Sequence, residues 1–262
     1  MKRLDRIAIN ILTPLNMASR EYGDDFVELI TSEFPFLSPD KYGNLEPLRN
    51  TYVEGQKDRM LDCWGNTFIW SRSRPFVEGD VHFRRGPRPT HSWIVIRLDK
   101  KVNIIDVVRF LQKIAVRFGA DFASVHYMAQ EEVAEILGDL ANGVSNPRLL
   151  FDNPRNGLHR NIVTSHHLQR FLPNLYWATI FGPPYVDLFG KELLLTAPAF
   201  QVTELAEKCV YMQLSPNPLD FASDYASQNR SRQHIKDYLD HDAFLDYSYP
   251  LDHRYSVPTF RI

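Results

Sequence analysis

Three runs of aromatic and β-branched residues constrain the fold of this chain most strongly. They lie around residues 68–70, 80–85 and 92–98, and turn-forming residues such as Gly79 and Gly86 stand between them. Short runs of this kind are typical of antiparallel strands. The regular alternation of strands, helices and Gly-rich turns found in doubly wound nucleotide-binding folds is missing. We therefore expect an α+β fold, with a largely antiparallel sheet flanked by helices.

The clearest helix is expected at residues 103–118. Asn103 is suited to cap its start and Gly119 to end it. Its apolar stripe consists of Val107, Leu111, Ile114 and Phe118. A polar loop is expected at 38–44. Further helices are predicted at 24–34, 131–140, 166–172 and 219–239, and further strands at 122–127, 176–181, around Val202 and at 209–214.

The length and composition favour one compact domain over residues 1–262. With 262 residues, 44% of them hydrophobic, the chain can bury a substantial core. The Gly-, Asn- and Pro-rich stretch at 141–157 is the best candidate for an internal boundary or a long surface loop. Both sides of it offer strands and helices, so two related halves are left open.

The sequence predicts a cytoplasmic protein. It contains only two cysteines, Cys63 and Cys209, which we interpret as reduced, buried thiols. The apolar stretch at 7–15 imitates a signal peptide, but Asn10 and Pro14 interrupt it and no A-x-A site follows. No stretch approaches the ~20 apolar residues of a membrane span, so no membrane partner is expected. Whether residues 1–15 belong to the fold is left open.

No local motif for catalysis, metal binding or cofactor binding is present, so we expect no enzyme activity, no metal and no cofactor. The neighbouring His166 and His167 should point in different directions and cannot share a metal. An enzyme with a dispersed site is the alternative. Its candidate residues are His126, His166 and Asp187.

A second alternative is a nucleic-acid-binding protein that uses the basic, aromatic segment 70–101. This segment has eight Lys or Arg residues and three acidic ones, interleaved with rings such as Trp70 and Phe83. Exposed rings and Arg on one face would form a stacking platform. A half-buried sheet with its rings inside gives the same pattern, and we favour this interpretation. The overall net charge of -2 also argues against a nucleic-acid partner.

The segment 218–253 combines acidic and aromatic residues. It holds seven Asp against three basic residues, together with several tyrosines. Such a surface suits binding to a basic protein, although a solvated acidic helix has the same composition. The candidate partner-binding residues are Tyr225, Asp237, Tyr238, Asp240, Asp242 and Asp246.

The segment 172–190, LPNLYWATIFGPPYVDLFG, continues into a related run at 197–219. Physically, Gly182 and the two prolines after it predict a sharp exit from a strand, with Tyr185 and Phe189 packing a short helix back onto it. The segment resembles a stretch in immunity proteins of bacterial polymorphic toxin and type VI secretion systems. The resemblance implies a cytoplasmic inhibitor that occludes a cognate toxin. Some related families accompany nuclease toxins. It transfers no binding residues, and a homodimer is left open.

Overall fold

A computed structural model describes residues 5–65, 67–84, 90–141, 161–250 and 252–262. Its described strands form one ten-stranded sheet in the order β3-β2-β4-β5-β6-β1-β7-β8-β10-β9, in which neighbouring strands are antiparallel. This confirms the expected α+β fold. The strands are β1 (Ile7–Thr13), β2 (Lys41–Gly43), β3 (Asn50–Thr51), β4 (Thr67–Ser73), β5 (Phe76–His82), β6 (Ser92–Leu98), β7 (Phe122–Tyr127), β8 (Ala178–Phe181), β9 (Gln201–Ala206) and β10 (Cys209–Gln213).

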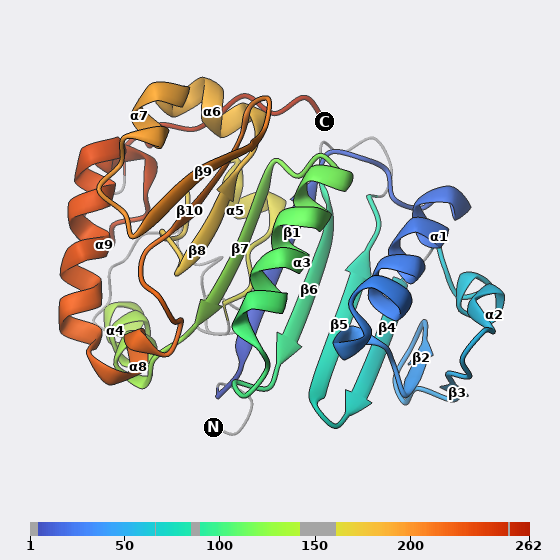
Figure 1. Cartoon of the computed structure of the whole chain (residues 1–262). Coiled ribbons are helices and arrows are strands. Elements are labelled where there is room, and N and C mark those ends of the chain that lie inside the picture. The colour runs from blue at the N-terminus through green and yellow to red at the C-terminus, as the bar shows by residue number, and fades with distance from the viewer. Residues whose placement is uncertain (1–4, 66, 85–89, 142–160, 251) are drawn as a thin grey trace.

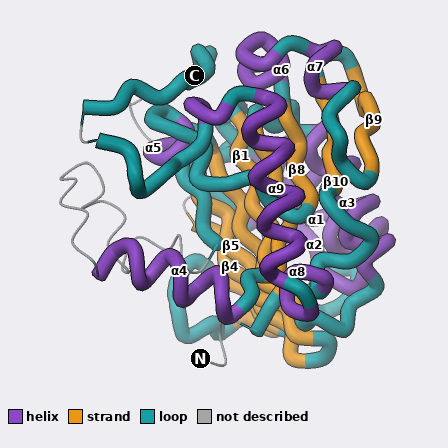
Figure 2. The backbone as a smooth tube through the Cα atoms, turned by 90° about the vertical axis from the view of Figure 1, so that its left-hand side faces the viewer, coloured by secondary structure: helices purple, strands orange, loops and turns teal. Residues whose placement is uncertain are grey.

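Helices cover both faces of the central and β8-side strands. In Figures 1 and 2, α1 and α3 lie on one face, α4 and α5 lie on the other, and α9 runs past the side that holds β8 and β10. The helices are α1 (Arg20–Glu28), α2 (Lys57–Leu61), α3 (Ile104–Arg117), α4 (Gln130–Ala141), α5 (Ser165–Leu168), α6 (Pro183–Phe189), α7 (Lys191–Leu195), α8 (Asp220–Ser223) and α9 (Tyr225–Leu239), with a π-helical turn at Leu29–Glu33 and 3-10 turns at Pro35–Leu37 and His241–Ala243.

Strand β1 lies in the middle of the sheet, between β6 and β7. All seven of its residues are buried, and they form the apolar stretch that imitates a signal peptide. A strand that is covered on both faces has a nearly continuous run of apolar residues without alternation. The sequence pattern of β1 therefore does not distinguish it as a strand. Residues from Ile7 to Thr13 are therefore part of the core of the fold.

Most predicted elements are confirmed, with shifted ends. The Asn103 side chain caps α3 by accepting a hydrogen bond from the Ile105 N–H at 3.1 Å, and Gly119 follows the helix with a φ of 53°. The predicted helix at 219–239 is broken at Asp224, which caps α9 instead by accepting from the Ser227 N–H at 3.1 Å. The expected loop at 38–44 contains the short strand β2.

Two rings of the basic, aromatic segment, Trp70 and Phe83, face the core. Trp70 is fully buried and packs against Phe26 of α1, with 5.5 Å between ring centroids. Phe83 is also buried. These rings are therefore not available to stack on bases, and the half-buried-sheet interpretation of this segment is the correct one for them.

The corner between β8 and α6 has the predicted geometry. Gly182 precedes α6, whose first two residues are prolines. Tyr185 and Phe189 stack on each other at 6.2 Å between centroids, and both contact Phe181 of β8. All three rings are buried. The segment that carries the family resemblance is therefore a structural corner.

Three further sequence predictions concern the domain boundary, the two cysteines and membrane spans. The candidate boundary at 141–157 lies outside the described residues, apart from Ala141 at the end of α4. Of the two free thiols, Cys209 is buried as expected, whereas Cys63 is only partly buried. Among the described residues, none of the helices has both the length and the apolar character needed to span a bilayer.

Candidate protein-binding surface and the pocket beside it

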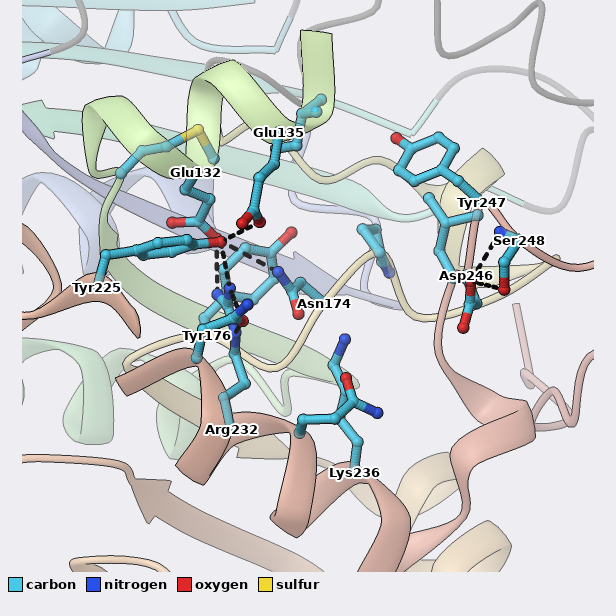
Figure 3. Close-up of a pocket in the computed structure, with 16 residues that line it drawn as sticks. Glu132, Glu135, Asn174, Tyr176, Tyr225, Arg232, Lys236, Asp246, Tyr247 and Ser248 are labelled. Atoms are coloured by element: carbon cyan, nitrogen blue, oxygen red, sulfur yellow. Dashed lines mark hydrogen bonds and ion pairs between the residues drawn. The ribbon is translucent and has the colours of Figure 1, made fainter. Parts of the chain in front are cut away.

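A pocket of about 310 Å³ lies between α4, α9 and the segment 245–248. Figure 3 shows Glu132 and Glu135 entering it from α4, Arg232 and Lys236 from α9, and Asp246 from the opposite side. We call it the Lys236 pocket. It is lined by Met128, Glu132, Glu135, Ile136, Pro173, Asn174, Tyr176, Tyr225, Asn229, Arg232, Gln233, Lys236, Leu245, Asp246, Tyr247 and Ser248.

A buried ion pair forms the floor of the pocket. Arg232 Nη1 donates to Glu132 Oε1 at 2.6 Å, and the two side chains are only 3% and 2% exposed. Burial acts to raise the pKa of Glu132, but the charge and hydrogen bond of Arg232, together with the hydrogen bond from His126, outweigh it, so the pKa lies well below its ordinary value. Glu132 is therefore held as a carboxylate inside the protein.

The amphipathic pattern of α9 brings its charges to this place. Arg232, Ile235, Lys236 and Leu239 are its buried residues, and their spacing places them on one face of the helix. Two further N–H groups of Arg232 form hydrogen bonds within its own helix, since Nε and Nη2 both donate to Asn229 Oδ1, at 3.1 and 2.7 Å. The guanidinium is thus fixed in place by both helices.

His126 of β7 supports the same carboxylate. Its Nδ1 accepts the backbone N–H of Trp177 at 3.1 Å, so the ring proton is on Nε2, which donates to Glu132 Oε2 at 2.7 Å. Both ring nitrogens are engaged, and the side chain is fully buried.

The structure does not join the three residues of the dispersed-enzyme alternative. His126 bonds to Glu132 and Trp177, as described above. His166 is exposed and lies 3.4 Å from an Arg170 nitrogen, and Asp187 is paired with Lys208 at 2.8 Å. His167 is buried beside the exposed His166, so the two rings diverge as predicted.

Lys236 packs its ammonium over an aromatic ring and not against a carboxylate. It is 9% exposed, and its Nζ lies 5.4 Å from the centroid of the Phe244 ring. Within the described part of the chain, the charges of Arg232, Glu132, Asp246 and Asp237 act on its ammonium, and no side-chain hydrogen bond does. Burial, followed by the nearby Arg232 charge, lowers the pKa of Lys236 to about 7.

The acidic groups at the mouth of the pocket are compensated locally. Glu135 Oε2 accepts the Tyr225 hydroxyl at 2.6 Å. Asp246 Oδ1 accepts both the N–H and the hydroxyl of Ser248, at 2.7 and 2.6 Å. These donors are neutral, so both carboxylates keep their negative charge.

Two of the candidate partner-binding residues, Tyr225 and Asp246, line this pocket, and the other four lie in the last turn of α9 and the turn that follows it. Asp237 and Asp242 have side chains that are 56% and 55% exposed, and Tyr238 is 37% exposed. Asp240 has a structural task, since it accepts the N–H of Asp242 at 3.0 Å and caps the turn His241–Ala243. We call the set the acidic–aromatic surface; its members are Tyr225, Asp237, Tyr238, Asp240, Asp242 and Asp246.

Sequence reasoning missed the three central residues Glu132, Arg232 and Lys236. A signal was present, because Arg232 and Lys236 share the apolar face of α9 with Ile235 and Leu239. Long charged side chains on the buried face of a helix require partners or a solvated pocket. Their partner Glu132 lies 100 residues away in sequence, and nothing local indicates the pairing.

A second buried polar chain was also missed by sequence reasoning. His91 Nδ1 lies 2.9 Å from Ser165 Oγ, and His91 Nε2 lies 3.1 Å from Asp121 Oδ2. The Ser165 oxygen also accepts the His91 backbone N–H at 2.8 Å. The Phe260 ring packs edge-on against the His91 ring at 5.0 Å. All three polar residues are buried, so this arrangement ties together distant segments of the chain.

The described residues contain no group of three or more His, Cys, Asp or Glu side chains placed to hold a metal ion. No protein-family model matches the chain, and no curated protein sequence matches it. Among solved structures, the chain is similar to one described as "Pseudomonas aeruginosa T6SS protein PA0821". The two share 13% identity with a TM-score of 0.49, over 88% of this chain and 73% of that one. A likeness this distant does not assign a function.

Proposed function

We propose that this chain is an immunity protein that binds a cognate secreted bacterial toxin and neutralises it by steric occlusion, without catalysis. A nuclease is one candidate for the toxin. The partner meets the acidic–aromatic surface, whose members other than Tyr225 lie at or just after the C-terminal end of α9. The inhibitor covers the active surface of the toxin. Inhibition therefore depends on the affinity of the complex and needs no catalytic step.

One observation carries this proposal. Residues 237–249 contain four Asp and three Tyr and no Lys or Arg, and Asp237, Tyr238 and Asp242 are exposed. Aromatic anchors surrounded by charges are the composition of tight protein interfaces. A surface of one sign also speeds the capture of a partner of the opposite sign, such as a basic enzyme that binds phosphate backbones. The resemblance of segment 172–190 to immunity proteins supports the same function.

The proposal predicts a neighbouring gene that encodes a toxin, and the experiment pairs the purified protein with that toxin domain. We expect a stoichiometric complex by native mass spectrometry and loss of toxin activity at one equivalent. The double variant Asp237→Lys/Asp242→Lys should bind at least ten-fold more weakly. Asp240 is left unchanged, because its capping role would confuse stability with binding.

The matched control is Asp58→Lys/Asp62→Lys, which makes the same charge change on α2. These two residues are exposed, and α2 lies on the other side of the molecule from α9 in Figure 1. The control should bind as the parent protein does. A toxin that remains fully active with excess protein would refute the proposal, whereas equal weakening by both double variants would place the interface elsewhere.

A further inference from the structure

Two histidines contact three carboxylates of the acidic–aromatic surface. His241 lies in the turn after α9, with its Nδ1 2.7 Å from Asp237 Oδ1 and its Nε2 3.5 Å from Asp246 Oδ2. His253 lies in the C-terminal segment, with its Nε2 3.5 Å from Asp242 Oδ1. Both histidines therefore belong to the surface on which a basic partner is proposed to bind.

The geometry around these rings is suited to a charged imidazole. The 2.7 Å contact with Asp237 requires a proton on Nδ1 of His241. A neutral ring then turns a lone pair toward Asp246, whereas the imidazolium donates to both carboxylates. The Nε2 atom of His253 is buried and makes no hydrogen bond to the described residues, so a proton on it would turn the contact with Asp242 into an ion pair.

Contacts that do not titrate hold this part of the chain in place. The Leu245 N–H donates to the Leu172 carbonyl oxygen at 2.8 Å, and the Ser256 N–H donates to the Asp242 carbonyl oxygen at 2.9 Å. The Tyr249 ring packs against both imidazole rings, with 5.7 and 3.9 Å between centroids. A change in protonation of the histidines is therefore expected to alter the charge of the surface and not the path of its backbone.

The charges give the direction of the effect. Imidazole is the side chain whose charge changes between about pH 5 and about pH 8. With both rings protonated, the three carboxylates keep one net negative charge, and with both rings neutral they keep all three. We propose that His241 and His253 regulate the acidic–aromatic surface by pH: their protonation weakens its attraction for a basic partner, and their deprotonation restores it. This inference rests on the proposed function, because it assigns a control to the same site.

Other titratable groups lie close to these histidines or their carboxylates, namely His234, Lys236, Tyr249 and Tyr255. Burial, followed by the hydrogen bond to Asp242, raises the pKa of Tyr249 to about 12, so Tyr249 stays neutral in this range. The pKa of Lys236 is about 7, so Lys236 titrates in the same range as the histidines. All four groups are kept in the variant below. A difference between parent and variant therefore reports on the two histidines.

The probe is hexalysine, whose side-chain ammonium groups keep their charge from about pH 6 to about pH 8. Isothermal titration calorimetry on the full chain at low salt should show binding about three-fold tighter or more at the higher pH. His241→Gln/His253→Gln should bind about as tightly at the lower pH as the parent does at the higher pH. The control His166→Gln removes an exposed imidazole from α5 and should keep the pH dependence of the parent.

The measurement on the parent protein does not depend on the folding of any variant. Equal affinity of the parent at the two pH values would overturn the proposal, and so would a double variant that keeps the pH dependence of the parent.

The toxin separates this inference from the proposed function. Capture of the toxin by the parent should become faster as the pH rises, and the double variant should lose most of this change. The same pH dependence in both proteins would overturn the regulation. A toxin that binds neither protein would refute the proposed function alone, because hexalysine tests the histidines without it.

Discussion

His126 donates a hydrogen bond from Nε2 to Glu132 Oε2 at 2.7 Å, while its Nδ1 accepts the Trp177 N–H. This bond joins the buried strand β7 to the first turn of α4. Together with the Glu132–Arg232 pair, it links the sheet to both helices that wall the pocket. The network therefore fixes the position of α4 and α9, on which the acidic–aromatic surface depends.

Glu132→Gln should destabilise the protein by about 3–5 kcal/mol, because it leaves the Arg232 guanidinium buried without a counter-charge. The amide also cannot accept on both sides at once, so its NH2 group faces a donor of either Arg232 or His126. Urea denaturation monitored by circular dichroism measures the loss.

The double variant Glu132→Leu/Arg232→Met provides the control for this network. Removing both charges leaves no uncompensated ion, so it should cost less than Glu132→Gln alone. The exposed pair formed by Arg20 and Asp58 serves as a reference, and Asp58→Asn should change stability little. Similar losses for Glu132→Gln and Asp58→Asn would contradict the buried-pair argument.

The stability of the protein should rise with pH above neutrality because of Lys236. Its pKa is about 7 in the folded chain and about 10.4 in an unfolded one. Between these values the unfolded state binds more protons, so raising the pH favours folding by up to ~1.4 kcal/mol per pH unit. Lys236→Met should lose this slope. Denaturation curves of both proteins from about pH 7 to about pH 9 test it, and parallel pH profiles would show that Lys236 is not desolvated.

Gly182→Val should destabilise the protein strongly. A Cβ atom at this position would collide with the Ala120 carbonyl oxygen and come within 2.8 Å of the Asp121 Cα. Backbone cannot move aside as a flexible side chain does, so we expect a loss of about 3 kcal/mol or more. Gly43→Ala is the control, since its nearest contact would be an ordinary 3.6 Å to Leu48. A melting temperature for Gly182→Val equal to that of the parent would refute this close-packing argument.

Toxin capture should be sensitive to salt if the acidic–aromatic surface steers it. Association rates measured by stopped-flow fluorescence should fall as ionic strength rises, because salt screens exposed charges. Asp237→Lys/Asp242→Lys should flatten this dependence, and Tyr238→Ala should mainly speed dissociation, as expected for an aromatic anchor. A salt-independent association rate would exclude electrostatic steering by this surface.

Local patterns in the sequence were enough to predict most elements but not their arrangement. Helix α3 was predictable because its stripe, cap and terminal glycine all agree. The break at Asp224 was not, because either a continuous or a capped helix satisfies the same apolar spacing. The exposed acids Asp237 and Asp242 could be identified as candidates, since the segment around them combines acidic and aromatic residues.

The sequence by itself determined the α+β class, the antiparallel strands and the acidic, aromatic composition of the C-terminal segment, because these follow from side-chain periodicity and charge. Only the tertiary structure placed β1 at the centre of the sheet and paired Glu132 with Arg232 across 100 residues. It also placed Lys236 in a pocket, with its ammonium over the Phe244 ring. Burial on both faces removes the alternation of apolar and polar residues by which a strand is recognised. The partner of a buried charge is the group that lies next to it in space, and the sequence alone does not show which group that is.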